Sequence, residues 1–574
     1  MRDSVMPYMT SGQVLTALGF GVEEHLTRMT SGVRGMRCDA SGQLLAGEYP
    51  VGLLGTDAIP PTPNGYTRLE RMLHLLVQSL LGSLPRPLDL GETLLVVATT
   101  KGNVRHLMED EEVGRCRLHR MAQRVAEGLG FTHQPIVVSN ACISGLSALI
   151  LASRILQSGG YEHAIVAGVD ELTPFIAEGF CGFRSLDSGA CRPYDARREG
   201  LNLGEGGGVV LLTYDRELVT ESVPVQLLGG AITNDANHIS APSRTGEELG
   251  QAIRLAMREA GVPAEQVAFV NPHGTATRYN DEMESKALAS AGVDGRPILG
   301  MKGYIGHTLA ASGMAECILA AEMLRRGEMV GTVGYEVSDL PVVIDVTSLP
   351  RRVEGDICIK TASGFGGCNA AVVMSRGKRL ESLTRPEPKG VETVGSVTVE
   401  PGRIVHNGLE WFHAETEGDF GRFLRDAHRV LSPNDERFAR LDDLCKLGVV
   451  AAEVLLDGIA VEDGYRFAVL LGNEWGSEQS DKRHWQYLQE YGSASPSVFV
   501  YTLPSIVVGE ICIRNGLKGD NTFVVSAESG LPELYGYARI LLEQGHADYC
   551  MVGWCEAAGA TPKADMRLLK RLNG

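Results

Sequence analysis

The sequence Val137-Val138-Ser139-Asn140-Ala141-Cys142-Ile143-Ser144-Gly145 reads as an apolar strand, a sharp turn of small residues and the start of a helix. Cys142 lies in the turn, where small neighbours leave room for a substrate carbonyl. A helix N-terminus offers unpaired N–H groups and positive potential, which lowers a thiol's pKa and favours the nucleophilic thiolate. Because the chain has 12 cysteines, a buried structural cysteine is the alternative reading. The strand–turn–helix context gives the interpretation of Cys142 as a nucleophile the same weight as this structural interpretation.

Outside this turn, short β-branched runs alternate with glycine-punctuated helical stretches from Gly91 to Met374. Leu94 to Ala98 and Ile165 to Val169 are typical of buried strands. Between them, residues 144–157 place apolar side chains at helical spacing. This alternation predicts an α/β unit whose parallel strands are covered by helices.

Length and composition limit the possible classes of protein. The chain has 574 residues, 44% of them hydrophobic, which is enough to bury two or more cores. A formal net charge of -18 argues against nucleic acid as a partner, because phosphate binding needs a basic face. Residues 1–12 lack the apolar core of a signal peptide, and no stretch has the ~18 uninterrupted apolar residues of a membrane span. We therefore expect a cytoplasmic protein with no membrane span.

The cysteines show no paired spacing, which indicates reduced thiols in a chain of this length. The sequence contains no CxxC or HExxH pattern, so nothing in it supports a metal site. We expect neither a metal nor a cofactor.

Two histidines lie in turns that resemble the turn of Cys142. His273 follows the apolar run 267–270, so it should emerge at the carboxyl end of a strand, where α/β folds place their ligands. His307 lies in a glycine-punctuated loop that leads into a small-residue helix at 309–324. Either histidine alone is more often structural. One cysteine and two histidines in three such turns form a candidate reaction centre.

A polar segment at 377–396 is poor in large apolar residues and reads as a linker between residues 1–376 and a second unit, 397–574. The second unit echoes the first at an offset of about 385 positions. The matching residues are Ser144-Gly145-Leu146, Arg154-Ile155-Leu156, Gly168 and Glu171, against Ser529-Gly530-Leu531, Arg539-Ile540-Leu541, Gly553 and Glu556. A divergent copy is favoured over two merely similar βαβ units.

Five motifs, in order, resemble those of the β-ketoacyl-acyl-carrier-protein synthases across Ser11 to Ser375. They are Asn140-Ala141-Cys142-Ile143-Ser144-Gly145; Cys191-Arg192-Pro193-Tyr194-Asp195 running to Leu203-Gly204-Glu205-Gly206; His273-Gly274-Thr275-Ala276-Thr277 with Asn280-Asp281; Lys302-Gly303-Tyr304-Ile305-Gly306-His307; and Gly364-Phe365-Gly366-Gly367. The resemblance implies the thiolase fold, a duplicated five-layered αβαβα arrangement, followed by a partial thiolase-like α/β half-domain.

The resemblance also implies roles for single residues. Cys142 would be the acyl acceptor, while His273 and His307 would hold the malonyl thioester and stabilise its enolate. The same resemblance implies supporting roles. Lys302 and Glu284 would form a charged pair near the site, and Phe365 would be a gating aromatic. Thr275 and Thr277 would place two hydroxyls beside the carrier's pantetheine arm. For the charged pair, a purely structural role is at least as probable as direct catalysis.

Two histidines favour chain elongation over priming, since relatives of the initiating type carry asparagine where His307 stands. A degradative thiolase is disfavoured, because its second catalytic cysteine has no clear counterpart here. The chain departs from the family pattern at Arg278, where proline is usual, and across Lys101 to Gln134. Both departures put the choice of substrate in doubt.

The second unit resembles the stretch before the nucleophile but lacks the nucleophile, since Ala527 stands opposite Cys142. It is similar to the chain-length factors, inactive partners that shape a synthase's acyl tunnel. We hypothesise that Phe523 to Ser526 pairs with a synthase's interface strand and that Phe499, Tyr501 or Leu503 walls the pocket. A degenerate structural appendage is an equal alternative.

The partner that the resemblance implies is an acidic acyl carrier protein, in its acyl and malonyl forms. Arg68, Arg71 and Arg198 match positions where related synthases display basic residues, although exposed arginines are usually only solvated surface. A homodimer, or a heterodimer with a synthase-like or chain-length-factor-like subunit, is expected. Two functions stay open: an active synthase of fatty acid, aryl polyene or polyketide biosynthesis, and a non-catalytic partner of another synthase.

Overall fold

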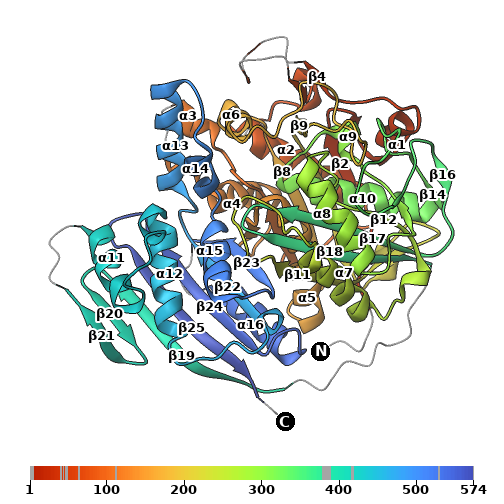
Figure 1. Ribbon diagram of the computed structural model, residues 1–574. Helices are drawn as coiled ribbons and strands as arrows, with labels where there is room; N and C mark the ends of the chain where they lie inside the picture. The colour runs from red at the N-terminus through yellow and green to blue at the C-terminus, as the bar shows by residue number, and fades with distance from the viewer. Residues whose placement is uncertain are drawn as a thin grey trace.

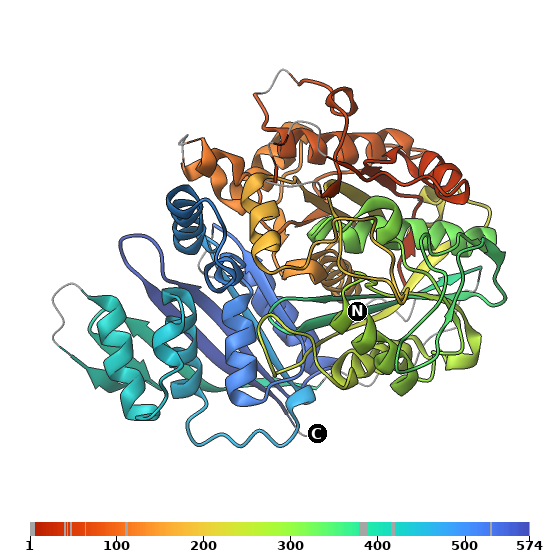
Figure 2. The ribbon, with the colours of Figure 1, turned by 45° about the horizontal axis from the view of Figure 1, so that its top comes forward.

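The computed structural model describes residues 6–38, 42, 44, 45, 49–62, 65–109, 113–377, 389–414, 419–527 and 531–572. Helices and strands alternate through the first unit, and the second unit lies against its side (Figures 1 and 2). The α/β class predicted from the sequence is confirmed.

The first unit is built in five layers. One sheet runs in the order β7 (Ile136–Val138), β6 (Thr93–Ala98), β8 (His163–Asp170), β10 (Gly206–Thr213) and β2 (Gln13–Thr16). The other sheet runs β11 (Val225–Asn234), β18 (Cys368–Arg376), β17 (Ile357–Gly364), β12 (Val267–Asn271) and β13 (Pro297–Ile298). Strand β1 (Tyr8–Met9) pairs with both β10 and β11 and joins the two sheets.

Helices fill the space between the sheets and cover their outer faces. Both α5 (Ser144–Ser158) and α10 (Ala310–Arg326) contact strands of each sheet, so they form the middle layer. The outer helices are α2 (Arg68–Ser83) and α4 (Leu118–Leu129) on one side, and α7 (Glu247–Ala260) and α8 (Arg278–Ser290) on the other. The middle helices are rich in small residues because both of their faces are buried. Helix α9 (Lys302–Ile305) precedes α10.

The second unit repeats the first half of this plan. Its strands run in the order β23 (Asn521–Val525), β22 (Phe467–Asn473), β24 (Tyr549–Glu556), β25 (Lys563–Arg571), β19 (Val391–Glu400), β20 (Arg403–His406) and β21 (Leu409–His413). The parallel and antiparallel pairings of the first six of these strands, β23 to β20, match those of β7, β6, β8, β10, β2 and β3 (Gly19–Phe20), while β21 is an addition at the end of the sheet. This shared topology confirms the internal duplication.

The repeated helices occupy equivalent places. Helix α15 (Ile506–Asn515) connects β22 to β23 as α4 connects β6 to β7, and α16 (Pro532–Glu543) connects β23 to β24 as α5 connects β7 to β8. The sequence match at Ser529 and Gly530 lies outside the described residues. Of the predicted linker, residues 378–388 also lie outside, while 391–396 already form part of β19. The linker is therefore shorter than expected at its carboxyl end.

The two units share one continuous sheet. Strand β23 pairs antiparallel with β7, with Val524 opposite Val138 and Val525 opposite Val137. The pairing predicted for Phe523 to Ser526 is thus formed within a single chain. One consequence is that a second copy of the chain cannot dimerise through β7 as the resemblance implied, because that edge is already occupied.

One continuous helical segment, Ala141–Ser158, is long and apolar enough to cross a membrane, and the bent pair Pro496–Thr502 and Ile506–Asn515 passes the same test if taken together. In the segment Ala141–Ser158, 89% of the residues are buried inside the protein. Its apolar character is explained by its place between two sheets.

Candidate active site

Cys142 lies in a strained turn at the carboxyl end of β7. The strand stops at Val138, and a short 3-10 helix, Ala141–Ile143, leads into α5. Ala141 has a φ of 48°, a left-handed conformation that costs about 1–3 kcal/mol and is typical of functional turns. The turn places Cys142 on the wall of a cavity.

His307 comes from the turn between α9 and α10. Gly306 before it has a φ of 73°, and a Cβ there would lie 2.9 Å from the backbone of Leu203, so only glycine fits. The His307 Nε2 atom lies 3.1 Å from Cys142 Sγ, and its Nδ1 atom lies 3.0 Å from Ser312 Oγ. Because a hydroxyl can donate or accept, His307 Nε2 can carry either a lone pair or a proton.

His273 emerges beyond the carboxyl end of β12, as predicted. Its ring centroid lies 5.1 Å from that of His307, and Cys142 Sγ and one nitrogen of each histidine lie within 4.8 Å of one another. The Nδ1 atom of His273 is buried and has no hydrogen-bond partner among the described residues. The structure therefore brings the three predicted catalytic side chains together.

Burial sets the charge of these three groups. Burial raises the pKa of the Cys142 thiol to about 12, and the positive charge of Lys302 only partly opposes this rise. Burial, reinforced by the charges of Lys302 and Lys360, lowers the pKa of both histidines well below its ordinary value. The backbone N–H at the start of the helix does lower the thiol pKa, as expected, but the upward effect of burial is larger, so the predicted net lowering is not found. Activation of Cys142 therefore depends on a base, and His307 Nε2 is in reach.

Lys302 does not pair with Glu284, contrary to the prediction. The Lys302 Nζ atom lies 2.6 Å from Glu316 Oε1, and Lys360 Nζ lies 2.6 Å from Glu316 Oε2. All three side chains are at most 1% exposed. One carboxylate between two ammonium groups leaves positive charge beside the histidines, which favours their neutral form.

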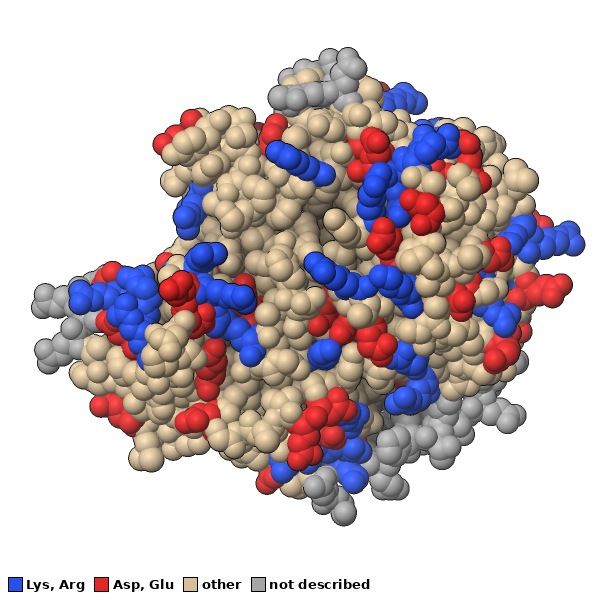
Figure 3. Space-filling view, in the orientation of Figure 1, with Lys and Arg blue, Asp and Glu red and all other residues tan. Residues whose placement is uncertain are grey.

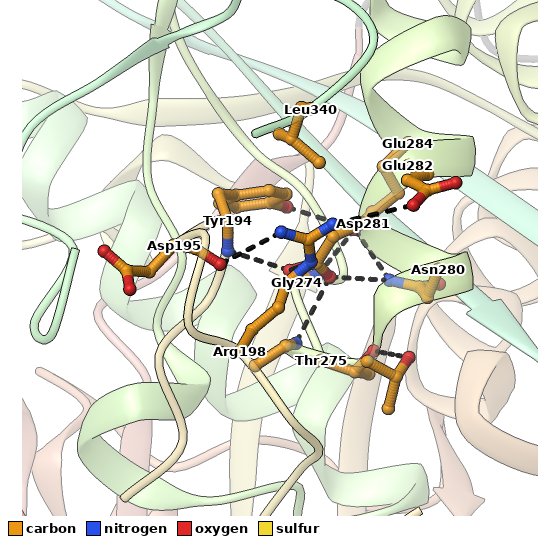
Figure 4. Close-up of polar contacts among 12 residues, drawn as sticks. Tyr194, Asp195, Arg198, Gly274, Thr275, Asn280, Asp281, Glu282, Glu284 and Leu340 are labelled. Atoms are coloured by element: carbon orange, nitrogen blue, oxygen red, sulfur yellow. Dashed lines mark hydrogen bonds and ion pairs between the residues drawn. The ribbon is translucent and has the colours of Figure 1, made fainter. Parts of the chain in front are cut away.

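Glu284 instead anchors the turn that carries His273 (Figure 4). Its carboxylate accepts hydrogen bonds from the backbone N–H of His273 at 2.6 Å and of Gly274 at 2.7 Å. The side chains of Asn280 and Tyr194 donate to the same carboxylate at 2.9 and 3.1 Å. Glu284 is therefore a buried positioning group.

Cys142, His273 and His307 line a cavity of about 410 Å³. Thr275 and Thr277 line it, with their hydroxyl oxygens 3.0 Å apart, in keeping with their predicted place beside a substrate arm. Phe365 lines it too, and its ring lies 5.0 Å from that of Phe183 and 6.0 Å from that of Phe180. The cavity therefore combines a cluster of aromatic rings with a pair of hydroxyls.

The predicted carrier-binding arginines are not three exposed cations. The Arg198 side chain is 1% exposed and pairs with Asp339, so its assignment to a carrier-binding surface is wrong. Arg68 makes a two-pronged contact with Glu205, at 2.6 and 2.8 Å, while Arg71 is partly buried. On the face drawn in Figure 3, basic and acidic side chains are interspersed, so no single-sign patch marks a docking site there.

The second unit places one aromatic ring against the cavity wall. Phe499, at the end of α14 (Pro496–Phe499), lies 5.7 Å from the ring of Phe180 and 6.2 Å from that of Phe183. Tyr501 instead lines a neighbouring groove of about 610 Å³, and Leu503 is buried in the core. Of the three residues predicted to wall the pocket, Phe499 is the one in ring contact with it.

Sequence reasoning missed several residues that support the site. Asp170 accepts a hydrogen bond from the backbone N–H of Ala310 at the start of α10 and holds the helix that follows His307. Glu316 and Lys360 carried a signal that could have found them, since each is a lone charge in an apolar, small-residue segment. Such charges are almost never buried unless paired.

Three segments of the chain match sequence models of one family. Residues 98–217 and 413–564 match "Beta-ketoacyl synthase, N-terminal domain", and residues 225–336 match "Beta-ketoacyl synthase, C-terminal domain". Both units therefore carry the N-terminal-domain pattern, which agrees with the duplicated topology.

Curated relatives are 3-oxoacyl-[acyl-carrier-protein] synthases. A putative mitochondrial enzyme of Schizosaccharomyces pombe is 26% identical over 46% of this chain and 66% of its own length. Synthase 2 of Mycobacterium leprae is 28% identical over 53% of this chain and 79% of its own length. Synthase 2 of Vibrio cholerae is 30% identical over 42% of this chain and 62% of its own length. The matched region thus spans less than two thirds of the length of two of these relatives.

Solved structures share the fold. The ketosynthase ApeO in complex with its chain length factor ApeC, from Xenorhabdus doucetiae, is 23% identical, with a TM-score of 0.56, over 65% of this chain and 98% of that one. The PfaC keto synthase–chain length factor is 13% identical, with a TM-score of 0.77, over 99% of this chain and 78% of that one. The layered fold, the Cys142–His273–His307 centre and the three matched segments together show that the chain belongs to the β-ketoacyl synthase family, with the thiolase fold.

Proposed function

We propose that the protein is a cytoplasmic β-ketoacyl-acyl-carrier-protein synthase. It catalyses decarboxylative condensation of a malonyl thioester with an acyl group held on Cys142, in fatty acid, aryl polyene or polyketide biosynthesis. The observation that carries this proposal is the 3.1 Å contact between His307 Nε2 and Cys142 Sγ, beside His273, on one cavity.

In the first half-reaction, the Cys142 sulfur attacks an acyl thioester and its proton moves to His307 Nε2. The tetrahedral oxyanion collapses as the carrier's thiolate leaves, and His307 returns the proton to that thiolate. Backbone N–H groups of Cys142 and Phe365 are the proposed oxyanion donors, each worth roughly 2.7–4 kcal/mol by mutational measure in other enzymes. The product is a thioester on Cys142 and a carrier thiol.

In the second half-reaction, a malonyl thioester loses its carboxylate as carbon dioxide, and the electron pair passes to an enolate. N–H groups of His273 and His307 donate to the enolate oxygen; with both pKa values lowered, each ring is neutral and has one N–H for this purpose. The enolate carbon then attacks the acyl group on Cys142, and the Cys142 thiolate leaves. The product is a β-ketoacyl thioester two carbons longer.

The second candidate function is a non-catalytic, chain-length-factor-like partner of another synthase. The relationship of the second unit to the first favours such a role for residues 397–574 only. The first unit retains Cys142, His273 and His307 with the sulfur and one nitrogen of each ring within 4.8 Å of one another, which supports catalysis by the whole chain.

We propose further that the second unit limits the length of the acyl chain, through Phe499. A Cβ on Gly179 of the first unit would lie 2.3 Å from the Phe499 ring, so the ring packs tightly against the helix that borders the cavity. In a Phe499→Ala variant we expect longer products in a condensation assay. Tyr491→Ala, an exposed position of the same unit, is the control. An unchanged product distribution in both variants would remove the length-limiting role.

The first experiment is intact-protein mass spectrometry after incubation with acyl-carrier thioesters of several lengths, on the wild type and Cys142→Ala. We expect a mass increase in the wild type that is lost in the variant. A lack of any adduct with every acyl donor would move the protein into the class of non-catalytic partners.

A further inference from the structure

Tyr194 occupies an unusual position behind the active site. It lies in the motif Cys191-Arg192-Pro193-Tyr194-Asp195, has a φ of 67° and is fully buried. A left-handed backbone at a bulky residue costs about 1–3 kcal/mol, so the surroundings must hold it there. Figure 4 shows its ring beside the acidic residues of α8.

Both hydrogen-bond donors of Tyr194 bind carboxylates of helix α8. Its backbone N–H donates to Asp281 Oδ2 at 2.8 Å, and its hydroxyl donates to Glu284 Oε2 at 3.1 Å. Asp281 and Glu284 also bind the backbone of the turn that carries His273. Ala276 N–H donates to Asp281 at 3.2 Å, and His273 N–H donates to Glu284 at 2.6 Å.

The Tyr194 hydroxyl also packs directly against this turn. Gly274 has a φ of 53°, and a Cβ there would lie 3.0 Å from the hydroxyl oxygen. Tyr194 therefore fixes the His273 turn from two sides: sterically at Gly274 and through the Glu284 carboxylate. His307 is held separately, by Ser312 and the Gly306 turn.

We infer that Tyr194 is a positioning residue for the decarboxylation half-reaction, holding His273 through Glu284 without contributing to acylation of Cys142. The inference rests on the proposed condensing activity. It separates two functions of the site, because His307 and not His273 contacts the Cys142 sulfur.

The charge of Glu284 provides a signature of this role. Burial raises the pKa of Glu284, while its N–H donors, the charge of Lys302 and the Tyr194 hydroxyl lower it. The other charged groups around it are Asp281, Glu316 and Lys360. The turn needs an ionised Glu284, so decarboxylation is lost as the pH falls through its pKa. Loss of the hydroxyl raises that pKa further and moves the acidic limb to higher pH.

The test uses full-length wild type and Tyr194→Phe, with two separate readouts. Acylation of Cys142 is followed by intact mass, and decarboxylation is followed as carbon dioxide released from a malonyl-carrier thioester. We expect acylation within about twofold of the wild type and decarboxylation slower by about 10–100-fold, because small misplacements of catalytic groups cost factors of this order. The acidic limb of the decarboxylation profile should move to higher pH.

Two further variants make the test decisive. Tyr537→Phe removes another buried tyrosine hydroxyl, which bonds Asp520 and is not among the residues that line the cavity, and should leave both half-reactions unchanged. If Tyr194→Phe does not fold, Glu284→Gln is tested instead. It should show the same loss of decarboxylation, and its pH profile should lack the acidic limb that protonation of Glu284 produces. An equal loss of both half-reactions, or none, in the folded variant overturns the inference. A wild type inactive in both assays would instead overturn the proposed function.

Discussion

At the scale of single residues, the two histidines of the site have different surroundings. His307 contacts the Cys142 sulfur at 3.1 Å, while the ring of His273 lies 5.1 Å from that of His307 and its Nδ1 atom lacks a hydrogen-bond partner within the described part of the chain. The sequence identified all three residues because each lies in a turn of small residues after a strand or before a helix. It could not give the thiol's pKa, since burial decides that value.

We predict that His307→Ala and His273→Ala fail at different steps. His307→Ala should slow acylation of Cys142 by about 10²–10⁴-fold, the usual contribution of a general base. Because burial raises the pKa of the Cys142 thiol to about 12, the residual rate should rise about tenfold per pH unit at lower pH, as the thiolate fraction does. His273→Ala should keep acylation and lose decarboxylation. Intact mass and carbon dioxide release measure the two steps, and equal losses in both variants would contradict the division.

At the scale of elements, one buried carboxylate ties three of them together. Glu316 of α10 binds Lys302 of α9 and Lys360 of β17, and all three side chains are shielded from solvent. The family resemblance implied a different pair, Lys302 with Glu284, and order along the chain does not show which helix face meets which strand. Only the packing of α10 between the two sheets brings Glu316 to both lysines.

We predict that Glu316→Gln destabilises the protein by about 3–5 kcal/mol, because it leaves two buried ammonium groups without a counter-charge. Chemical denaturation, read as the free energy of unfolding, measures the loss. The matched control is Glu543→Gln on α16, whose partner Arg539 is 66% exposed; it should cost about 1 kcal/mol or less. Similar losses of unfolding free energy in the two variants would show that the buried cluster stabilises the protein no more than an exposed ion pair does.

At the scale of the whole molecule, the second unit completes the first. Strand β23 covers the edge of β7, and the Asn140 side chain bonds the backbone of Asn521 at 2.6 Å and of Phe523 at 2.7 Å. Buried charge pairs also cross the junction, among them Lys101 with Asp481 at 2.7 Å. The junction thus extends from β7 to Asn140, two residues before Cys142, which links the second unit physically to the nucleophile turn.

We predict that residues 1–376 expressed alone will self-associate or aggregate, whereas the intact chain will not associate through β7. The shortened chain exposes a strand edge and leaves buried Lys101 without Asp481, both of which disfavour an isolated domain. Size-exclusion chromatography with light scattering measures the mass of each form. A stable, monomeric shortened chain with unchanged product length would show that the second unit is a dispensable appendage.

Local features of the sequence were enough to predict the α/β class, the duplication, the family and the grouping of Cys142, His273 and His307. Each of these depends on local periodicity or on motifs whose residues are close in the chain. The tertiary structure decided the rest: Glu316 and not Glu284 as the partner of Lys302, the burial of Arg198, the thiol's raised pKa, and the pairing of β23 with β7 inside one chain. These depend on which surfaces meet and how much water they exclude, and such distances between remote segments exist only in the folded protein.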